Sequence, residues 1–184
     1  MSDPIRLQAV CEAILAVARE PVAPQVLAEV TGEEASVAEV ETALETLRQR
    51  HEAEGSGLLV ERVGGGWRLA TRPQHEAALR QFLGMRSRSR LTQAGLEVLA
   101  IIAYRQPITL PEINFLRSVN SAGVIRTLLD RKLVAVAGRK QVVGTPLLYR
   151  TTREFLVHFG LPDLSSLPSL EEVEHVAGEG ASAT

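Results

Sequence analysis

The feature of the sequence that most constrains the fold is an ordered series of segments between Leu91 and Leu161. Thr92–Arg105 reads TQAGLEVLAIIAYR and is apolar on almost every side, which predicts a helix buried between other elements. Pro107 ends this helix, because proline cannot donate the hydrogen bond that would continue it. The segment Thr109–Glu112 then has the spacing of a capping box and predicts a short helix that ends near Arg117.

A third helix and a two-stranded hairpin complete the series. Asn120 and Ser121 are good N-caps for this helix. Its apolar residues recur at helical spacing: Val124, Leu128 and Leu129. Strands at 133–137 and 147–151, with a turn at 138–145, predict the hairpin. Three helices followed by a hairpin, the wing, predict a winged-helix domain in which the third helix occupies the recognition-helix position.

Four motifs of this stretch resemble the segregation and condensation protein B family. They follow in the family's order: LTQAGLEVLAIIAYRQPITLPEI, VNSAGVIRTLLDRKLV, GRK with GTPLLYRTT, and EFLVHFGL. The resemblance implies an accessory subunit of the bacterial SMC–kleisin condensin complex. The chain departs from the family at one point, because Arg117–Gly123 reads RSVNSAG where the family usually has RGVNSDG.

The first half of the chain repeats the plan of the second. Leu7, Cys11, Ile14 and Ala18 fall at helical spacing in a helix that ends before Pro21, 86 positions ahead of Pro107. The segments that follow are a short helix at 24–30, a helix from a Ser36–Glu39 capping box to about 51, a hairpin at 58–63 and 67–71, and a closing helix at about 74–83. We therefore expect a mainly α protein with small β-hairpins (α+β), built from two tandem winged-helix domains.

The charge distribution supports a division into domains. The chain has 184 residues and a net charge of −2, but residues 1–85 carry 8 Lys/Arg against 13 Asp/Glu, residues 86–160 carry 12 against 4, and residues 161–184 carry 0 against 5. We expect an N-terminal domain at 1–85, a basic linker at 86–90, a C-terminal domain at 91–168 and an acidic, disordered tail at 169–184. The basic block suits nucleic acid or an acidic protein, and charge alone does not choose between them.

The N-terminal domain is predicted to bind protein. Its candidate recognition helix begins with Glu39, Glu41 and Glu45, whose carboxylates would repel DNA phosphates. A small domain often completes its core against a second copy of itself, and the resemblance implies a homodimer formed by this domain. The candidate dimer residues lie on the first helix: Leu7, Val10 and Ile14.

The C-terminal domain is predicted to bind the main partner. The resemblance implies a groove for an extended segment of the kleisin subunit, segregation and condensation protein A, and through it a link to the SMC ATPase. The candidate residues are Tyr104, Arg105, Phe115, Arg117, Asn120 and Arg126. The pattern leaves open whether Phe115 and Tyr104 are exposed anchors or core residues. The candidates for non-specific DNA contact are Arg131, Lys132, Arg139 and Lys140.

The sequence indicates neither catalysis nor a bound cofactor. The single cysteine, Cys11, fits a small core residue, and the four histidines are scattered without metal-ligand spacing. No apolar run reaches the roughly 18 residues of a membrane span. We expect a cytoplasmic, nucleoid-associated, non-catalytic subunit that binds and stabilises the kleisin on SMC heads and so supports chromosome condensation and segregation. The alternative is a winged-helix DNA-binding regulator that uses its basic C-terminal domain.

Overall fold

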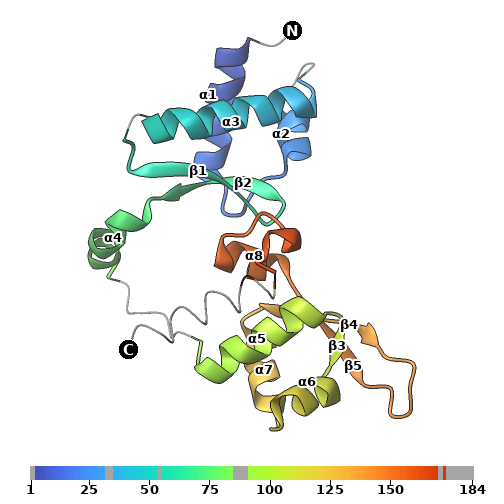
Figure 1. The fold of residues 1–184 in the computed structure, drawn as a ribbon. Helices are drawn as coiled ribbons and strands as arrows, with labels where there is room; N and C mark the ends of the chain where they lie inside the picture. Colours follow the sequence, from blue (N-terminus) through green and yellow to red (C-terminus); the bar gives the residue numbers. More distant parts are fainter. Residues whose placement is uncertain (1–2, 32–34, 54, 85–90, 170–171, 173–184) are drawn as a thin grey trace.

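The computed structural model describes residues 3–31, 35–53, 55–84, 91–169 and 172, which form two winged-helix units (Figure 1). The first unit contains α1 (Pro4–Val17), α2 (Pro24–Val30), α3 (Val37–Ala53), β1 (Leu58–Val63), β2 (Gly66–Thr71), the 3₁₀ turn η1 (Pro73–His75) and α4 (Glu76–Phe82). The second contains α5 (Gln93–Arg105), β3 (Ile108–Thr109), α6 (Leu110–Arg117), α7 (Ala122–Asp130), β4 (Val134–Arg139), β5 (Leu147–Thr151), α8 (Arg153–Phe159) and the 3₁₀ turn η2 (Leu164–Ser166). The predicted linker at 86–90 and most of the predicted tail lie outside the described residues.

Both predicted capping boxes are confirmed. The Ser36 hydroxyl accepts a hydrogen bond from the Glu39 amide at 3.2 Å, and the Glu39 carboxylate accepts one from the Ser36 amide at 2.8 Å. Thr109 and Glu112 make the same reciprocal pair at the start of α6. Each box satisfies two backbone N–H groups that the first turn of a helix leaves without an intrahelical acceptor. Short local patterns thus define where α3 and α6 begin.

The core of the first unit lies between α1, α3 and the hairpin. Its buried side chains are Leu7, Cys11, Leu15, Leu27, Val40, Ala43, Leu44, Leu47, Val60 and Trp67. Trp67 packs against the unit's own helices, and its indole N–H donates to the Glu41 carboxylate at 3.1 Å. The Trp67 backbone also exchanges two 2.8 Å hydrogen bonds with Val22, which ties the segment after α1 to the hairpin.

The core of the second unit lies between α5, α7, α8 and a three-stranded sheet of order β3-β5-β4. Ile108 of β3 pairs with Tyr149 of β5, and Val136 of β4 pairs with Tyr149 from the other side. Helix α5 covers this sheet with one face, formed by Gly95, Val98, Leu99, Ile102 and Ala103. The opposite side of α5 is exposed at Leu96 and Ala100, so the prediction that this helix is enclosed all round was wrong. The unit is too small to cover both sides.

Other boundaries and faces also differ from the prediction. Strand β4 runs from Val134 to Arg139, whereas a strand at 133–137 was expected. Its pairing with β5 is irregular between Val136 and Gly138. On α1 Leu15 is buried together with Leu7 and Cys11, whereas Ile14 is only partly buried. Helix α4 forms where a closing helix was expected, but of its side chains only Leu79 is even partly buried. It therefore extends from the unit and does not close it (Figure 1).

Gly66 gives a test of the first unit's packing. A Cβ at this position would lie 2.8 Å from the carbonyl carbon and oxygen of Val22, which are backbone atoms that cannot rotate away. We expect Gly66→Ala to lower the free energy of unfolding by about 1–3 kcal/mol, the usual cost of overpacking. Gly57→Ala is the control, because its Cβ would meet His75 at an ordinary 3.8 Å. Urea unfolding followed by Trp67 fluorescence measures both, and equal small losses would contradict the close packing at Gly66.

Candidate protein-binding site

The second unit exposes a cluster of apolar side chains on α6 and just after it. Phe115 is 85% exposed, and Leu116 and Val119 are each about half exposed. Ile113, on the opposite side of α6, is fully buried in the core. The question of whether Phe115 belongs to the core is thus settled in favour of exposure. Leu116 is half exposed, so the side of α6 that faces the core is formed by Ile113, with Leu110 partly buried against the same core.

These residues border a groove of about 490 Å³ that we call the α6 groove. Its lining comes from the end of α5, from β3 and from α6: Arg105, Pro107, Ile108, Pro111, Glu112, Phe115 and Leu116. Five of its seven lining residues are apolar, and the other two bring a cation, Arg105, and a carboxylate, Glu112. Two of the predicted partner residues, Arg105 and Phe115, lie on it together.

The wing reaches α6 beside this groove. The Lys140 ammonium lies 2.5 Å from Oε1 of Glu112, while Oε2 of Glu112 accepts from the Thr109 hydroxyl at 2.6 Å and from its amide at 2.9 Å. These donors stabilise the ionised carboxylate, with the Lys140 hydrogen bond contributing most, and they lower the pKa of Glu112 to about 2. The same carboxylate thus caps α6 and holds the base of the wing beside the groove.

The lowered pKa of Glu112 predicts a pH-dependent stability. An unfolded glutamate has a pKa near 4.3. The stabilisation is therefore fully present above about pH 4 and is lost as the pH falls through about 2. We expect thermal unfolding scans to show a drop in melting temperature across this window that is smaller in Glu112→Gln. Glu154→Gln, which removes an exposed carboxylate of the same unit, should keep the wild-type slope. An identical slope in Glu112→Gln would contradict the ion pair.

Three of the predicted partner residues are engaged within the second unit. The Tyr104 hydroxyl donates to the Pro168 carbonyl at 2.8 Å. The Arg117 guanidinium donates to Glu97 at 2.8 Å and to the Ser121 hydroxyl at 2.9 Å, and its side chain is only 13% exposed. The Asn120 side chain accepts from the amide of Ala122, the first residue of α7, at 2.9 Å, while Ser121 is the N-cap and makes no side-chain capping bond. Arg126 is exposed on α7. Of the six, Arg105 and Phe115 best fit a surface that a partner can reach.

The candidate DNA contacts lie on two segments, after α7 and in the wing. Arg131 and Lys132 follow α7, and Arg131 lines a cleft that faces the first unit. Arg139 donates to the Thr145 carbonyl within the wing, and Lys140 pairs with Glu112 on α6. Two of the four candidates, Arg139 and Lys140, therefore make contacts within the second unit.

The first unit has apolar surface of its own. A pocket of about 340 Å³ lies between α1 and α3, lined by Pro4, Leu7, Gln8, Ala38, Glu39, Thr42, Ala43 and Thr46. Leu7 is therefore both a core residue and part of this pocket, while Val10 and Ile14 are half-buried beside it on α1. Ile5, Val17 and Phe82 are also strongly exposed, and the sequence pattern did not single them out.

The described residues offer little to catalysis. Burial raises the pKa of the Cys11 thiol, which lies fully enclosed in the first core. His51 is held by Glu12 at 2.8 Å and by the Ser56 hydroxyl at 3.1 Å. Within the described part of the chain no three His, Cys, Asp or Glu side chains are grouped so as to hold a metal ion. None of the helices described there has the length and apolar character to cross a membrane.

These observations define a tandem winged-helix protein whose exposed features are apolar surfaces suited to other proteins. The chain belongs to the segregation and condensation complex subunit ScpB family, whose model matches residues 9–170. It is 42% identical to segregation and condensation protein B of Syntrophotalea carbinolica over 98% of this chain and 90% of that protein. It is also 42% identical to the Myxococcus xanthus protein over 95% of this chain, but spans only 52% of that relative. The crystal structure of ScpB from Mycobacterium tuberculosis is 34% identical, with 88% of this chain and 99% of that chain covered and a TM-score of 0.43.

Proposed function

We propose that this protein is a non-catalytic subunit of an SMC–kleisin condensin-like complex, in which a homodimer binds the kleisin and stabilises it on the SMC heads. Membership of a family of segregation and condensation complex subunits supports this role. The observation that carries the binding part is the α6 groove with Phe115 exposed at its side. The role implies a cytoplasmic, nucleoid-associated protein that supports chromosome condensation and segregation.

The α6 groove suits an extended apolar segment of a partner. A partner that covers an exposed phenylalanine and a half-exposed leucine removes apolar surface from water, and this burial favours binding. Aromatic residues also supply much of the binding energy in many interfaces. Arg105 at the end of α5 and the Glu112–Lys140 pair supply a polar rim around the apolar centre. This combination of apolar centre and charged rim is the usual composition of a protein interface.

The first unit supplies the dimer in this proposal. Leu7, Val10 and Ile14 lie along α1, and Leu7 opens onto the apolar pocket between α1 and α3. Glu39, Glu41 and Glu45 of α3 keep DNA away from the same unit. Glu41 and Glu45 also make contacts inside the unit. Glu41 accepts a hydrogen bond from Trp67, and Glu45 forms a salt bridge with Arg48.

Light scattering on the purified full chain tests the proposal. We expect the mass of two chains for the protein alone and a stable larger complex when the kleisin from the same genome is added. A generic DNA duplex at physiological salt should leave the mass unchanged. The absence of a kleisin complex, together with duplex binding that weakens steeply with added salt, would instead identify a winged-helix DNA-binding regulator.

A further inference from the structure

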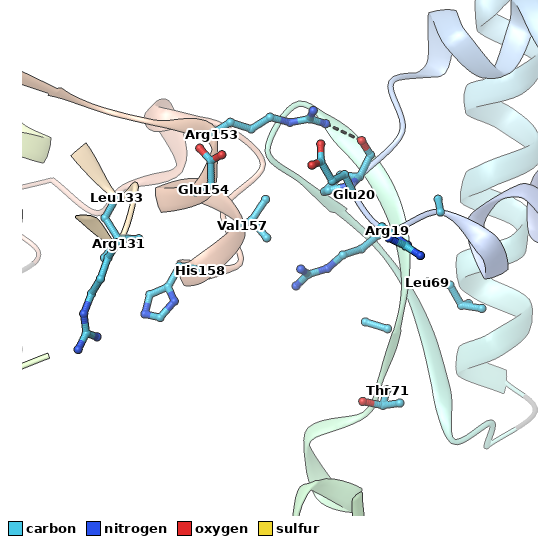
Figure 2. A pocket seen from close by; sticks show the side chains of 14 residues that line it. Arg19, Glu20, Leu69, Thr71, Arg131, Leu133, Arg153, Glu154, Val157 and His158 are labelled. Carbon is cyan, nitrogen blue, oxygen red and sulfur yellow. Dashed lines mark hydrogen bonds between the residues drawn. The ribbon is translucent and has the colours of Figure 1, made fainter. Parts of the chain in front are cut away.

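The wing turn of the first unit is bonded to the end of the second. The amides of Gly64 and Gly65 donate to the carbonyls of Leu161 and Pro162, each at 2.9 Å. In the opposite direction Arg153 of α8 donates from Nε to the Gly64 carbonyl at 2.8 Å and from Nη2 to the Pro21 carbonyl at 2.5 Å. Figure 2 shows the Arg153 side chain reaching across from α8 to the first unit. Three of these four hydrogen bonds meet at the Gly64–Gly65 turn, and the fourth joins Arg153 to the segment after α1.

The turn fits this place because its first residue is glycine. Gly64 is buried at a φ of +58°, and a Cβ there would lie 3.0 Å from Cγ2 of Val157 and 3.3 Å from Cγ of Arg153. Gly65 has a similar φ of +73°, but a Cβ on it would meet no atom within 4 Å. Both glycines therefore adopt a positive φ, which glycine tolerates best. Only at Gly64 would a side chain also collide with α8.

Away from this turn the two units diverge. A cleft of about 770 Å³ opens beside it, with one wall from the end of α1 and from β2 and the other from α8 and the segment after α7 (Figure 2). Arg19 lies on the first wall, and Arg131 and His158 lie on the second. Because a cleft separates the units here, the bonds at the wing turn have a large share in setting their relative angle.

We infer that the Gly64–Gly65 turn and Arg153 form an interdomain lock that fixes the angle between the two winged-helix units and the width of the cleft. Arg153 is suited to this task because its planar guanidinium donates in two directions at once, here to carbonyls on two separate segments of the first unit. Successive turn amides such as those of Gly64 and Gly65 are also groups that can bind a phosphate. In this protein they bind carbonyls of the second unit, so the first wing is committed to the lock and not to nucleic acid.

Hydrogen exchange on the full chain tests the lock, because the Gly64 and Gly65 amides are two of its bonds. In Arg153→Ala and in Gly64→Ala we expect the segment that contains these amides to exchange about tenfold faster or more. Small-angle X-ray scattering should show a larger radius of gyration at the same protein concentration. Protection of α3 and α5 should stay as in the wild type, which separates opening of the lock from unfolding of either unit.

Two control variants sharpen this test. Gly65→Ala imposes the same unfavourable φ on an alanine without touching α8, and Arg150→Ala removes an exposed arginine of the neighbouring strand. Both should keep wild-type scattering. Arg153→Lys keeps the charge but cannot reach both carbonyls, so it should behave like Arg153→Ala. Wild-type exchange and scattering in Arg153→Ala would overturn the lock, even if Gly64→Ala fails to fold.

Discussion

Replacing Leu99 by alanine should lower the free energy of unfolding by about 3 kcal/mol, within the roughly 2–5 kcal/mol that such core truncations cost. Leu99 is 2% exposed in the middle of α5 and belongs to the buried cluster of the second unit. The loss combines the transfer free energy of the three buried carbon atoms that the substitution removes with the cost of a cavity that the surrounding helices cannot fully close. Urea unfolding followed by circular dichroism measures the change.

Leu96 provides a matched comparison for Leu99. It is the same residue type on the same helix, one turn away, and it is 42% exposed. Leu96→Ala should therefore cost less than about 1 kcal/mol, as surface changes usually do. Equal losses at the two positions would show that α5 is enclosed on both sides, as the apolar sequence suggested, and would contradict the packing described here.

The positions of most helices could be predicted because their determinants are local. The Ser36–Glu39 and Thr109–Glu112 boxes mark helix starts with hydrogen bonds that span only three residues. The helix that precedes Pro107 ends at Arg105, as the proline requires. The same order of helices and hairpin occurs in both halves of the chain, and the two-unit architecture could therefore be predicted from the sequence pattern.

The interdomain contact could not be predicted because its partners are far apart in the chain. Arg153 and the Gly64 carbonyl are separated by 89 positions, and the sequence around either residue gives no indication that the two are in contact. The run Gly64–Gly66 falls between the two strands of the hairpin expected at 58–63 and 67–71, but its close approach to Val157 and to Val22 depends on tertiary packing. A run of three glycines at a wing was the only available signal that another segment comes near.

The roles of single side chains in the second unit were predictable only in part. Arg117 was named as a partner residue on the family resemblance, and it binds Glu97, 20 residues earlier on α5, inside the unit. Phe115 sits between inward and outward positions of a helix of only eight residues, so periodicity could not decide its burial. Likewise the basic balance of residues 86–160 left nucleic acid and an acidic protein open as partners, and it could not show that Lys140 pairs with Glu112 or that Arg139 donates to the Thr145 carbonyl.

Replacing Phe115 by alanine should weaken kleisin binding by about 30-fold, equivalent to about 2 kcal/mol, the threshold of an interface hot spot. The physical reason is that Phe115 borders the α6 groove and has 85% of its surface available for a partner to cover. Because so little of it is buried in the free protein, the substitution should leave the free energy of unfolding nearly unchanged. Isothermal titration of the full-length kleisin into each variant gives the affinity, and urea unfolding gives the stability.

Phe82→Ala is the matched control for this measurement, since Phe82 is the same residue type and is 86% exposed, on α4 of the first unit. It should bind the kleisin as the wild type does if the loss at Phe115 reflects the α6 groove itself. An equal loss in both variants would assign binding to general exposed apolar surface or to the first unit. Wild-type affinity in Phe115→Ala would remove the α6 groove from the kleisin interface, while a surviving wild-type complex would still support the subunit role.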